Sequence, residues 1–337
     1  MRNPKSVALA LLLLLAGVFV GAPFVLSFSS KKEAVVYIRK TDDWNKVDQQ
    51  IKSQANAAGR LYYRLFLALT DYENRFRKGR YDLGQGASIV KVLRALRNGK
   101  ELPVRLTLKQ VRTMDELASF LADKLQPSRQ EWLQLFRSPA LLDSVGRKPE
   151  TLIALFIPNT YEVYWSTTPQ QFVDRMAQEN KAFWNDTRRK QAEGLGLSPD
   201  EVVTLASIVD AETQYDPEKA KVAGMYLNRL RIDMPLQADP TVKFALKDFG
   251  LRRILNKHLS VNSPYNTYRN KGLPPGPIRI PALSSIEGVL NAERHNYIYM
   301  CAKEDFSGSH NFATTYEEHL QNAQNYARAL DQRGIKS

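Results

Sequence analysis

The sequence predicts an α+β protein with two folded parts behind an apolar N-terminal segment. The chain has 337 residues, of which 43% are hydrophobic and 25% charged, which leaves room for two domains with separate cores. Short strand-like and helical patterns alternate as far as residue 150, and longer helical patterns with proline-rich loops follow them.

The N-terminal segment has the length of a membrane span. No charged residue occurs from Ser6 to Ser30, and a span needs about 20 mostly apolar residues. We therefore predict a cytoplasmic tail at residues 1–6, a transmembrane anchor at 7–28, and the remaining chain outside the cytoplasm. The alternative is a signal peptide cut after the small residues at 20–22, although Pro23 directly behind them disfavours that cut.

Residues 34–150 combine small helical and strand-like units. The segment "LPVRLTL" at 102–108 alternates apolar and polar residues, which is typical of a half-buried strand. Capping-box patterns at Thr113 and Ser128 predict two helices. Because no group of catalytic residue types occurs here, we predict a spacer or a binding module.

Charge and composition exclude several classes of function. The 48 Lys and Arg residues against 35 Asp and Glu give a net charge of +13, which suits an anionic partner such as lipid or an acidic polymer. The basic residues are scattered without any nucleic-acid-binding motif, so we expect no nucleic-acid partner. Cys301 is the single cysteine, and the four histidines lack metal-site spacing, so we expect neither a metal nor another cofactor.

A helix predicted from Ser198 onward carries a carboxylate in phase with its apolar face. A capping box and a proline mark its start. The residues of its inner face, which recur at helical spacing, are Val202, Leu205, Val209 and Glu212. Asp210 lies about 200° around the axis from Glu212, so the two carboxylates cannot converge on one point.

Glu212 is predicted to lie in the last turn of this helix. Pro217 disfavours a helical conformation at Asp216, and a second helix should run from there to Arg231. Burial and the C-terminal end of the helix dipole both favour a neutral carboxyl group, which is what a general acid needs. The alternative is an ion pair between Glu212 and Arg229 or Arg231.

Four motifs carry a resemblance to a known family. They are "LASIVDAET" (205–213), "LNRLRIDMPLQADPTV" (227–242), "YNTYRNKGLPPGPI" (265–278) and "GSHNFATTYEEH" (308–319). In this order they resemble the motifs of the endolytic murein transglycosylases, the YceG-like (MltG) family. The resemblance extends over residues 60–325.

The resemblance implies an enzyme whose catalytic acid is Glu212. Members of the family cut the β-1,4 bond between N-acetylmuramic acid and N-acetylglucosamine without water and leave 1,6-anhydromuramoyl ends. One carboxyl group would protonate the leaving oxygen and then accept the proton of the muramoyl C6 hydroxyl, so the second carboxylate of hydrolytic glycosidases is not needed. The family usually has Glu where this chain has Asp210, which indicates a structural role there.

The same motifs imply the residues of a sugar-binding cleft. Tyrosine faces and amide or hydroxyl groups suit acetamido sugars, and the implied residues are Gln237, Asp239, Tyr265, Asn266, Thr267, Tyr268 and His310. Each has an alternative role: the residues at 265–268 could only form a turn, Asp239 could cap a helix, and His310 could satisfy a buried hydrogen bond.

The N-terminal half matches the family less specifically. The segment at 77–96 resembles a small LysM-like α/β module, so we expect this module with connecting helices at 34–150 and the catalytic domain at 151–337. Departures from the family pattern occur at Asn159, at Ile153-Ala154 and at Arg279. The expected partners are peptidoglycan strands, the cell inner membrane and peptidoglycan synthases. The alternative function is a non-catalytic peptidoglycan-binding scaffold of the wall-synthesis machinery.

Overall fold

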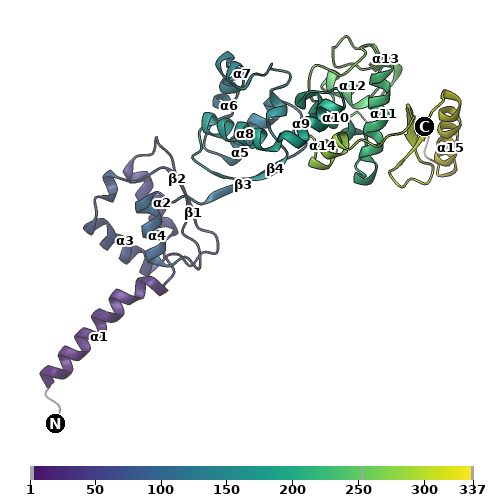
Figure 1. Ribbon diagram of the computed structural model, residues 1–337. Coiled ribbons are helices and arrows are strands. Elements are labelled where there is room, and N and C mark those ends of the chain that lie inside the picture. Colours follow the sequence, from purple (N-terminus) through teal and green to yellow (C-terminus); the bar gives the residue numbers. More distant parts are fainter. Residues whose placement is uncertain (1–3, 252, 335–337) are drawn as a thin grey trace. The chain divides into compact units, whose positions relative to one another are not determined.

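The computed structural model describes residues 4–251 and 253–334 and has the predicted mixed α+β composition (Figure 1). The chain forms two compact units. The first comprises Met1–Leu106, Ala122–Pro127 and Glu162–Thr168, and the second comprises Thr107–Leu121, Ser128–Tyr161 and Pro169–Ser337. This division differs from the predicted boundary at residue 150, because most of the segment from 107 to 150 packs within the second unit.

The first unit packs helices around a two-stranded antiparallel sheet. Its elements are α1 (Pro4–Val25), β1 (Val35–Ile38), α2 (Trp44–Gln54), α3 (Ala57–Leu69), β2 (Gly79–Asp82) and α4 (Ile89–Asn98). Strands β1 and β2 pair from Val35↔Asp82 to Ile38↔Gly79. Apolar side chains of both strands and of α2, α3 and α4 share one core. The LysM-like character of this part stays a prediction.

Helix α1 ends before the predicted end of the membrane anchor. Its last residue is Val25, and Phe28 is fully buried in the core of the first unit, where its ring meets Tyr63 edge-on. None of the helices that the structure describes is both long enough and apolar enough to cross a bilayer. The anchor expected over residues 7–28 therefore stays a prediction.

The second unit is mainly helical. Strands β3 (Pro103–Leu108) and β4 (Asn159–Tyr164) pair with each other, and the division between the units runs through both. The helices that follow β3 are α5 (Met114–Lys124), α6 (Arg129–Phe136), α7 (Pro139–Val145), α8 (Pro169–Phe183), α9 (Asp186–Gly194), α10 (Pro199–Glu212), α11 (Lys219–Arg231), α12 (Asp239–Leu246), α13 (Asn256–Leu259), α14 (Leu283–Leu290) and α15 (Tyr316–Gln332).

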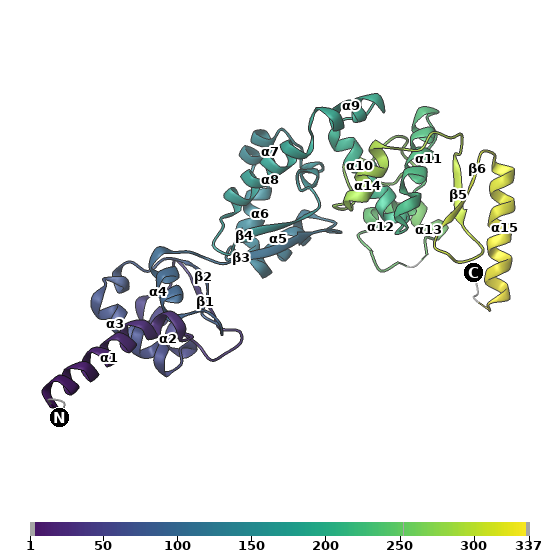
Figure 2. The same cartoon turned by 60° about the horizontal axis from the view of Figure 1, so that its bottom comes forward.

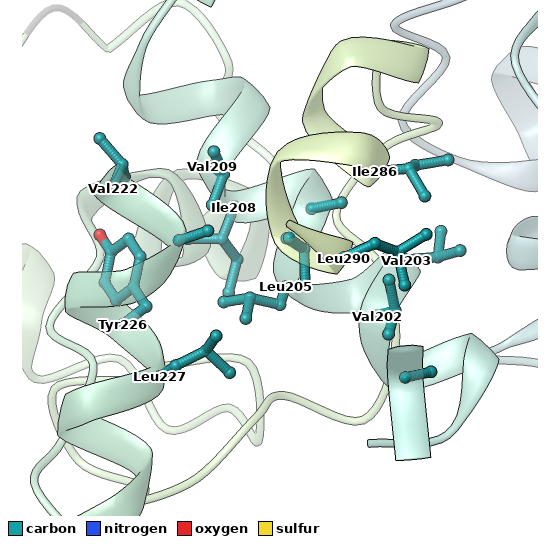
Figure 3. Packing of buried hydrophobic residues seen from close by; sticks show 14 of the residues in the cluster. Val202, Val203, Leu205, Ile208, Val209, Val222, Tyr226, Leu227, Ile286 and Leu290 are labelled. Carbon is teal, nitrogen blue, oxygen red and sulfur yellow. The ribbon is translucent and has the colours of Figure 1, made fainter. Parts of the chain in front are cut away.

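The core of the second unit lies between α10, α11 and α14 (Figure 3). The predicted start of α10 is confirmed, since the Ser198 hydroxyl accepts from the Glu201 backbone and the Glu201 carboxylate accepts from the Ser198 backbone. Every residue of α10 from Val202 to Asp210 is buried, so this helix is surrounded on all sides. Burial of this many apolar side chains fixes α10 rigidly and with it the position of Glu212 at its end.

The corner after α10 lies at Pro217 as predicted, but the α-helix that follows begins at Lys219 and not at Asp216. Pro217 lies in a short 3-10 turn at Asp216–Glu218, and α11 continues from it. Gly224 allows α11 to approach the chain before β5 closely, because a Cβ at this position would lie 2.3 Å from the carbonyl oxygen of Glu293. Alanine there would push this chain segment away from α11.

A hairpin of two strands completes the unit near its C-terminus. Strands β5 (Tyr299–Ala302) and β6 (His310–Ala313) pair antiparallel, with Ala302 opposite His310. Helix α15 runs beside this hairpin (Figure 2). The hairpin therefore presents residues of β5 and the start of β6 to the helices of the core.

Candidate active site

A cavity of about 250 Å³ lies at the C-terminal end of α10. Five of the eight predicted site residues line it: Glu212, Gln237, Asp239, Tyr268 and His310. The remaining lining residues are Met225, Tyr226, Arg229, Leu236, Met300, Cys301 and Ala302. Helices α10, α11 and α12, the loop before α12, and the β5–β6 hairpin thus converge on one concave site.

Glu212 is a half-buried carboxyl group in the wall of this cavity. The Tyr226 hydroxyl donates a hydrogen bond of 2.8 Å to its Oε1. Burial raises the pKa of Glu212 to about 7, and the negative charge of Asp239 acts in the same direction. The Tyr226 hydrogen bond and the charges of Lys243 and Arg229 oppose this rise. The carboxyl group therefore keeps its proton to a higher pH than an ordinary glutamate and can donate it.

The arginine pairing considered as an alternative for Glu212 does not form. Arg229 donates from Nε to the Ile298 carbonyl at 2.6 Å and from Nη1 to the Leu236 carbonyl at 2.8 Å. Arg231 donates to the Asn228 side chain instead. Among the described residues, no ion pair includes Glu212. Arg229 thus ties the loop before α12 and the chain before β5 to α11 and leaves the carboxyl group free to react.

Asp210 lies on the opposite side of α10, and both of its carboxylate oxygens contact protein groups. Its carboxylate accepts hydrogen bonds from the Ala282 backbone at 3.1 Å and the Ser285 hydroxyl at 2.8 Å. Arg279 and Lys219 lie 3.4 and 3.6 Å from its oxygens. The structural role predicted for Asp210 is confirmed, because this buried side chain joins α10 to the N-terminus of α14.

Gln237 and Asp239 reach the cavity from the loop before α12 and from its first turn. Gln237 has a φ of +50°, a left-handed conformation that is rare for a side chain of this kind, and its backbone N–H donates to the Thr267 carbonyl. Asp239 accepts a hydrogen bond of 2.6 Å from the Tyr268 hydroxyl. The helix cap considered for Asp239 is absent, since it is the first residue of α12 and makes no capping hydrogen bond.

Asn266 and Thr267 correct the prediction that the whole "YNTY" motif contacts substrate. Both side chains are fully buried. Asn266 donates to the carbonyls of residues 259 and 261, and the Thr267 hydroxyl accepts from the Ala238 backbone and contacts Thr241. Their hydrogen-bonding groups are used inside the protein, so they support the loop that carries Tyr268 and Gln237.

Tyr265 also lies outside the residues that line the cavity. Its ring packs against Phe244 of α12, with the ring centroids 4.7 Å apart. This position corresponds to the packing role that was the alternative for the tyrosines of this motif. The motif thus contributes one side chain, Tyr268, to the cavity.

His310 combines both roles considered for it. It lines the cavity, and its Nδ1 lies 2.8 Å from Oε2 of the buried Glu218, whose Oε1 accepts from the His310 backbone at 2.7 Å. Glu218 thereby fixes the orientation of the imidazole ring.

Sequence reasoning missed Glu218, Tyr226 and the β5 residues as parts of the site. For Tyr226 a signal existed, because its position on the inner face of the second helix directs it toward the end of the first. Among residues 4–251 and 253–334, no group of three or more His, Cys, Asp or Glu could hold a metal ion together.

Comparisons with known proteins agree with one another. The model of the YceG-like family matches residues 36–325. Two relatives named endolytic murein transglycosylase are each 26% identical: that of Bacillus subtilis (strain 168) covers 77% of this chain, and that of Streptococcus pneumoniae (strain R6) covers 93%. The chain spans 75% of the Bacillus relative and 63% of the pneumococcal one.

A solved structure of a yceG-like protein from Listeria monocytogenes is similar with a TM-score of 0.58 and 25% sequence identity. The match covers 87% of this chain and 99% of that one. The fold of this chain therefore has a counterpart in an experimentally solved protein.

Proposed function

Because the chain belongs to the YceG-like family, we propose that it is a lytic transglycosylase that cuts the glycan strands of peptidoglycan, with Glu212 as catalytic acid and base. The family expected from the sequence motifs is confirmed by the match over residues 36–325. The relatives named endolytic murein transglycosylase support the activity. The observation that carries the proposal is a carboxyl group with a pKa of about 7 in a cavity wall, where it forms no ion pair with the described residues.

In the proposed reaction Glu212 acts twice. Its proton passes to the glycosidic oxygen as the bond from that oxygen to muramoyl C1 breaks. The muramoyl C6 oxygen then forms a new bond to C1, and its proton passes to the Glu212 carboxylate. The acid is thereby regenerated, and no water is consumed. A pKa near the working pH suits a group that must give up and take back a proton in one cycle.

Asp239 requires a test of its own, since it is a second carboxylate in the same cavity. A hydrolase would use such a group to activate water or to attack the sugar. Its hydrogen bond from the Tyr268 hydroxyl and its place at the start of α12 favour a supporting role. In that position its negative charge helps to keep Glu212 protonated.

The test is digestion of purified murein sacculi with the wild-type protein, Glu212→Gln and Asp239→Asn, followed by mass spectrometry of the released fragments. We expect 1,6-anhydro ends, lighter by one water than hydrolytic ends, from the wild type and Asp239→Asn. Glu212→Gln should release none. Hydrolytic ends that disappear in Asp239→Asn would replace the proposed reaction by hydrolysis, and binding to sacculi without any product from the wild type would establish the scaffold alternative.

We further propose that α1 holds the protein at the cell inner membrane, with the second unit outside the cytoplasm and near the synthases that make new strands. The support is an exposed apolar surface, since Leu12, Leu15 and Val20 are each at least 65% exposed to solvent. Membranes from cells that express the full chain should retain it after an alkaline carbonate wash. Recovery of the full chain in the wash would contradict this placement.

A further inference from the structure

A second cavity adjoins the candidate active site and shares His310 with it. It has a volume of about 370 Å³. Its other lining residues come from the corner before α11, from α11 itself, from the chain between α14 and β5, and from the β5–β6 hairpin: Tyr215, Pro217, Glu218, Lys221, Glu293, Lys303, Ser307, Ser309 and Phe312. The proposed reaction at Glu212 uses none of these side chains.

The charged groups of this cavity are unevenly paired. Glu218 holds His310, and Glu293 lies 3.7 Å from Lys221, so both acidic side chains have basic partners. Lys303 differs, because none of the acidic side chains that the structure describes lies within ion-pair distance of it, and it interacts only at longer range with the exposed Asp305 of the same loop. The cavity therefore offers one ammonium group that forms no ion pair with the described residues.

The hairpin fixes Lys303 at the rim of the cavity. Lys303 follows directly after β5, and its backbone N–H donates to the Ser309 carbonyl at 2.9 Å, which closes the 303–309 loop. In the same loop the hydroxyls of Ser307 and Ser309 lie 2.7 Å apart and also line the cavity. A cation and two hydroxyl groups on one short loop are suited to a carboxylate.

We propose that this second cavity binds the peptide that is attached to the muramoyl residue, with Lys303 contacting a peptide carboxylate. This inference rests on the proposed function. If Glu212 acts at muramoyl C1, the muramoyl ring lies in the first cavity. The peptide is attached through O3 of this ring, so it begins within the width of one sugar from that cavity. N-acetylglucosamine is neutral, and the lactyl carboxyl group of N-acetylmuramic acid is neutral while it forms the amide bond to the peptide, whereas the attached peptide carries free carboxylates. The enzyme would thus prefer strands that still bear their peptides.

The test compares two substrates, intact glycan strands and the same strands after an amidase has removed the peptides and the lactyl carboxylates thus exposed have been converted to methyl amides. The variants are Lys303→Ala, Lys303→Glu and Lys303→Arg, with Lys190→Ala on the exposed face of α9 as the matched control. We expect Lys303→Ala to lower kcat/KM on the peptide-bearing strands on the order of tenfold, which corresponds to the loss of one charge-assisted contact. Lys303→Glu should lose more, Lys303→Arg should retain most activity, and cleavage of the peptide-free strands should be unchanged in all of them.

Two outcomes would overturn the inference. Equal losses on both substrates would mean that the cavity binds sugar or only supports the fold. Equal activity of Lys303→Glu and the wild type on peptide-bearing strands would mean that no anion binds there. Cleavage of peptide-free strands by the wild type tests the proposed function separately, so failure of one proposal can be told from failure of the other.

Discussion

The two carboxylates near the end of α10 have opposite surroundings, although they are two residues apart. Asp210 faces α14 and is saturated by two hydrogen-bond donors and two cations. Glu212 faces the cavity and receives one hydrogen bond, from Tyr226. Both lie on a helix whose burial fixes them, and the helical phase directs them to different surroundings.

The comparison shows that the number of compensating partners separates a structural carboxylate from a reactive one. A buried carboxylate with donors on every side holds elements together. A carboxyl group that is desolvated with a single donor keeps its proton to a higher pH, as the pKa of about 7 for Glu212 indicates. Four predictions test this contrast, from the largest expected effect to the smallest.

The first concerns the rate of cleavage. Glu212→Gln removes the proton that the reaction needs while it retains the size of the side chain, so we expect kcat to fall by a factor on the order of 10² to 10⁴. Initial rates of fragment release from glycan strands measure it. Glu193→Gln on the exposed face of α9 is the matched control and should keep the wild-type rate. A Glu212→Gln rate above one tenth of the wild-type rate would show that Glu212 is not the catalytic acid.

The second concerns stability. Asp210→Ala removes the counter-charge of the partly buried Arg279 and one of the two counter-charges of the buried Lys219, which keeps Asp216 at 2.7 Å. We expect a loss of about 3–5 kcal/mol in the free energy of unfolding, as is typical when one partner of a buried ion pair is removed. Urea unfolding at pH 7 measures it. A loss below about 1 kcal/mol would show that solvent or relaxed side chains compensate these cations.

The third prediction concerns a substitution that should stabilise the protein, in contrast to Asp210→Ala. Folded Glu212 titrates near pH 7 and unfolded Glu near 4.5, so its contribution to stability is fully present below about pH 4.5 and is lost as the pH rises through 7. Glu212→Gln has no such loss. We expect the variant to match the wild type at pH 4 and to exceed its free energy of unfolding by roughly 3 kcal/mol at pH 8. A difference that does not change with pH would contradict the raised pKa.

The fourth concerns the pH dependence of cleavage. Since the reaction starts from protonated Glu212, log(kcat/KM) should fall with a slope of −1 above pH 7. Tyr226→Phe removes the hydrogen bond that favours the ionised form, so the alkaline limb should move to higher pH, by about one unit or less. A shift to lower pH in Tyr226→Phe would show that the tyrosine stabilises the neutral carboxyl group instead.

Local rules were sufficient to predict the helix that carries Glu212. The capping box at Ser198, the helical phase up to Glu212 and the proline corner at Pro217 depend on neighbours within a few residues, and the structure has all three. The opposed directions of Asp210 and Glu212 follow from the same geometry. The absence of an arginine pair did not follow from it, because the carbonyl groups that hold Arg229 include one of residue 298.

The parts of the site that sequence reasoning missed depend on packing between distant segments. Asn266 and Thr267 carry the same hydrogen-bonding groups whether they bind a sugar or a backbone. The structure shows that both side chains are buried and that the Thr267 carbonyl accepts from the Gln237 backbone. The pair of Glu218 and His310 joins residues 92 apart in the chain. The division into units also escaped prediction, because the chain passes between them several times and composition does not record contacts.

A ¹³C NMR titration of the Glu212 carboxyl carbon, assigned by comparison with Glu212→Gln, tests the central claim most directly. The account predicts a midpoint near pH 7. A midpoint near 4.5, the ordinary value for a solvated glutamate, would contradict it, because Glu212 would then be fully ionised at neutral pH with no proton to donate.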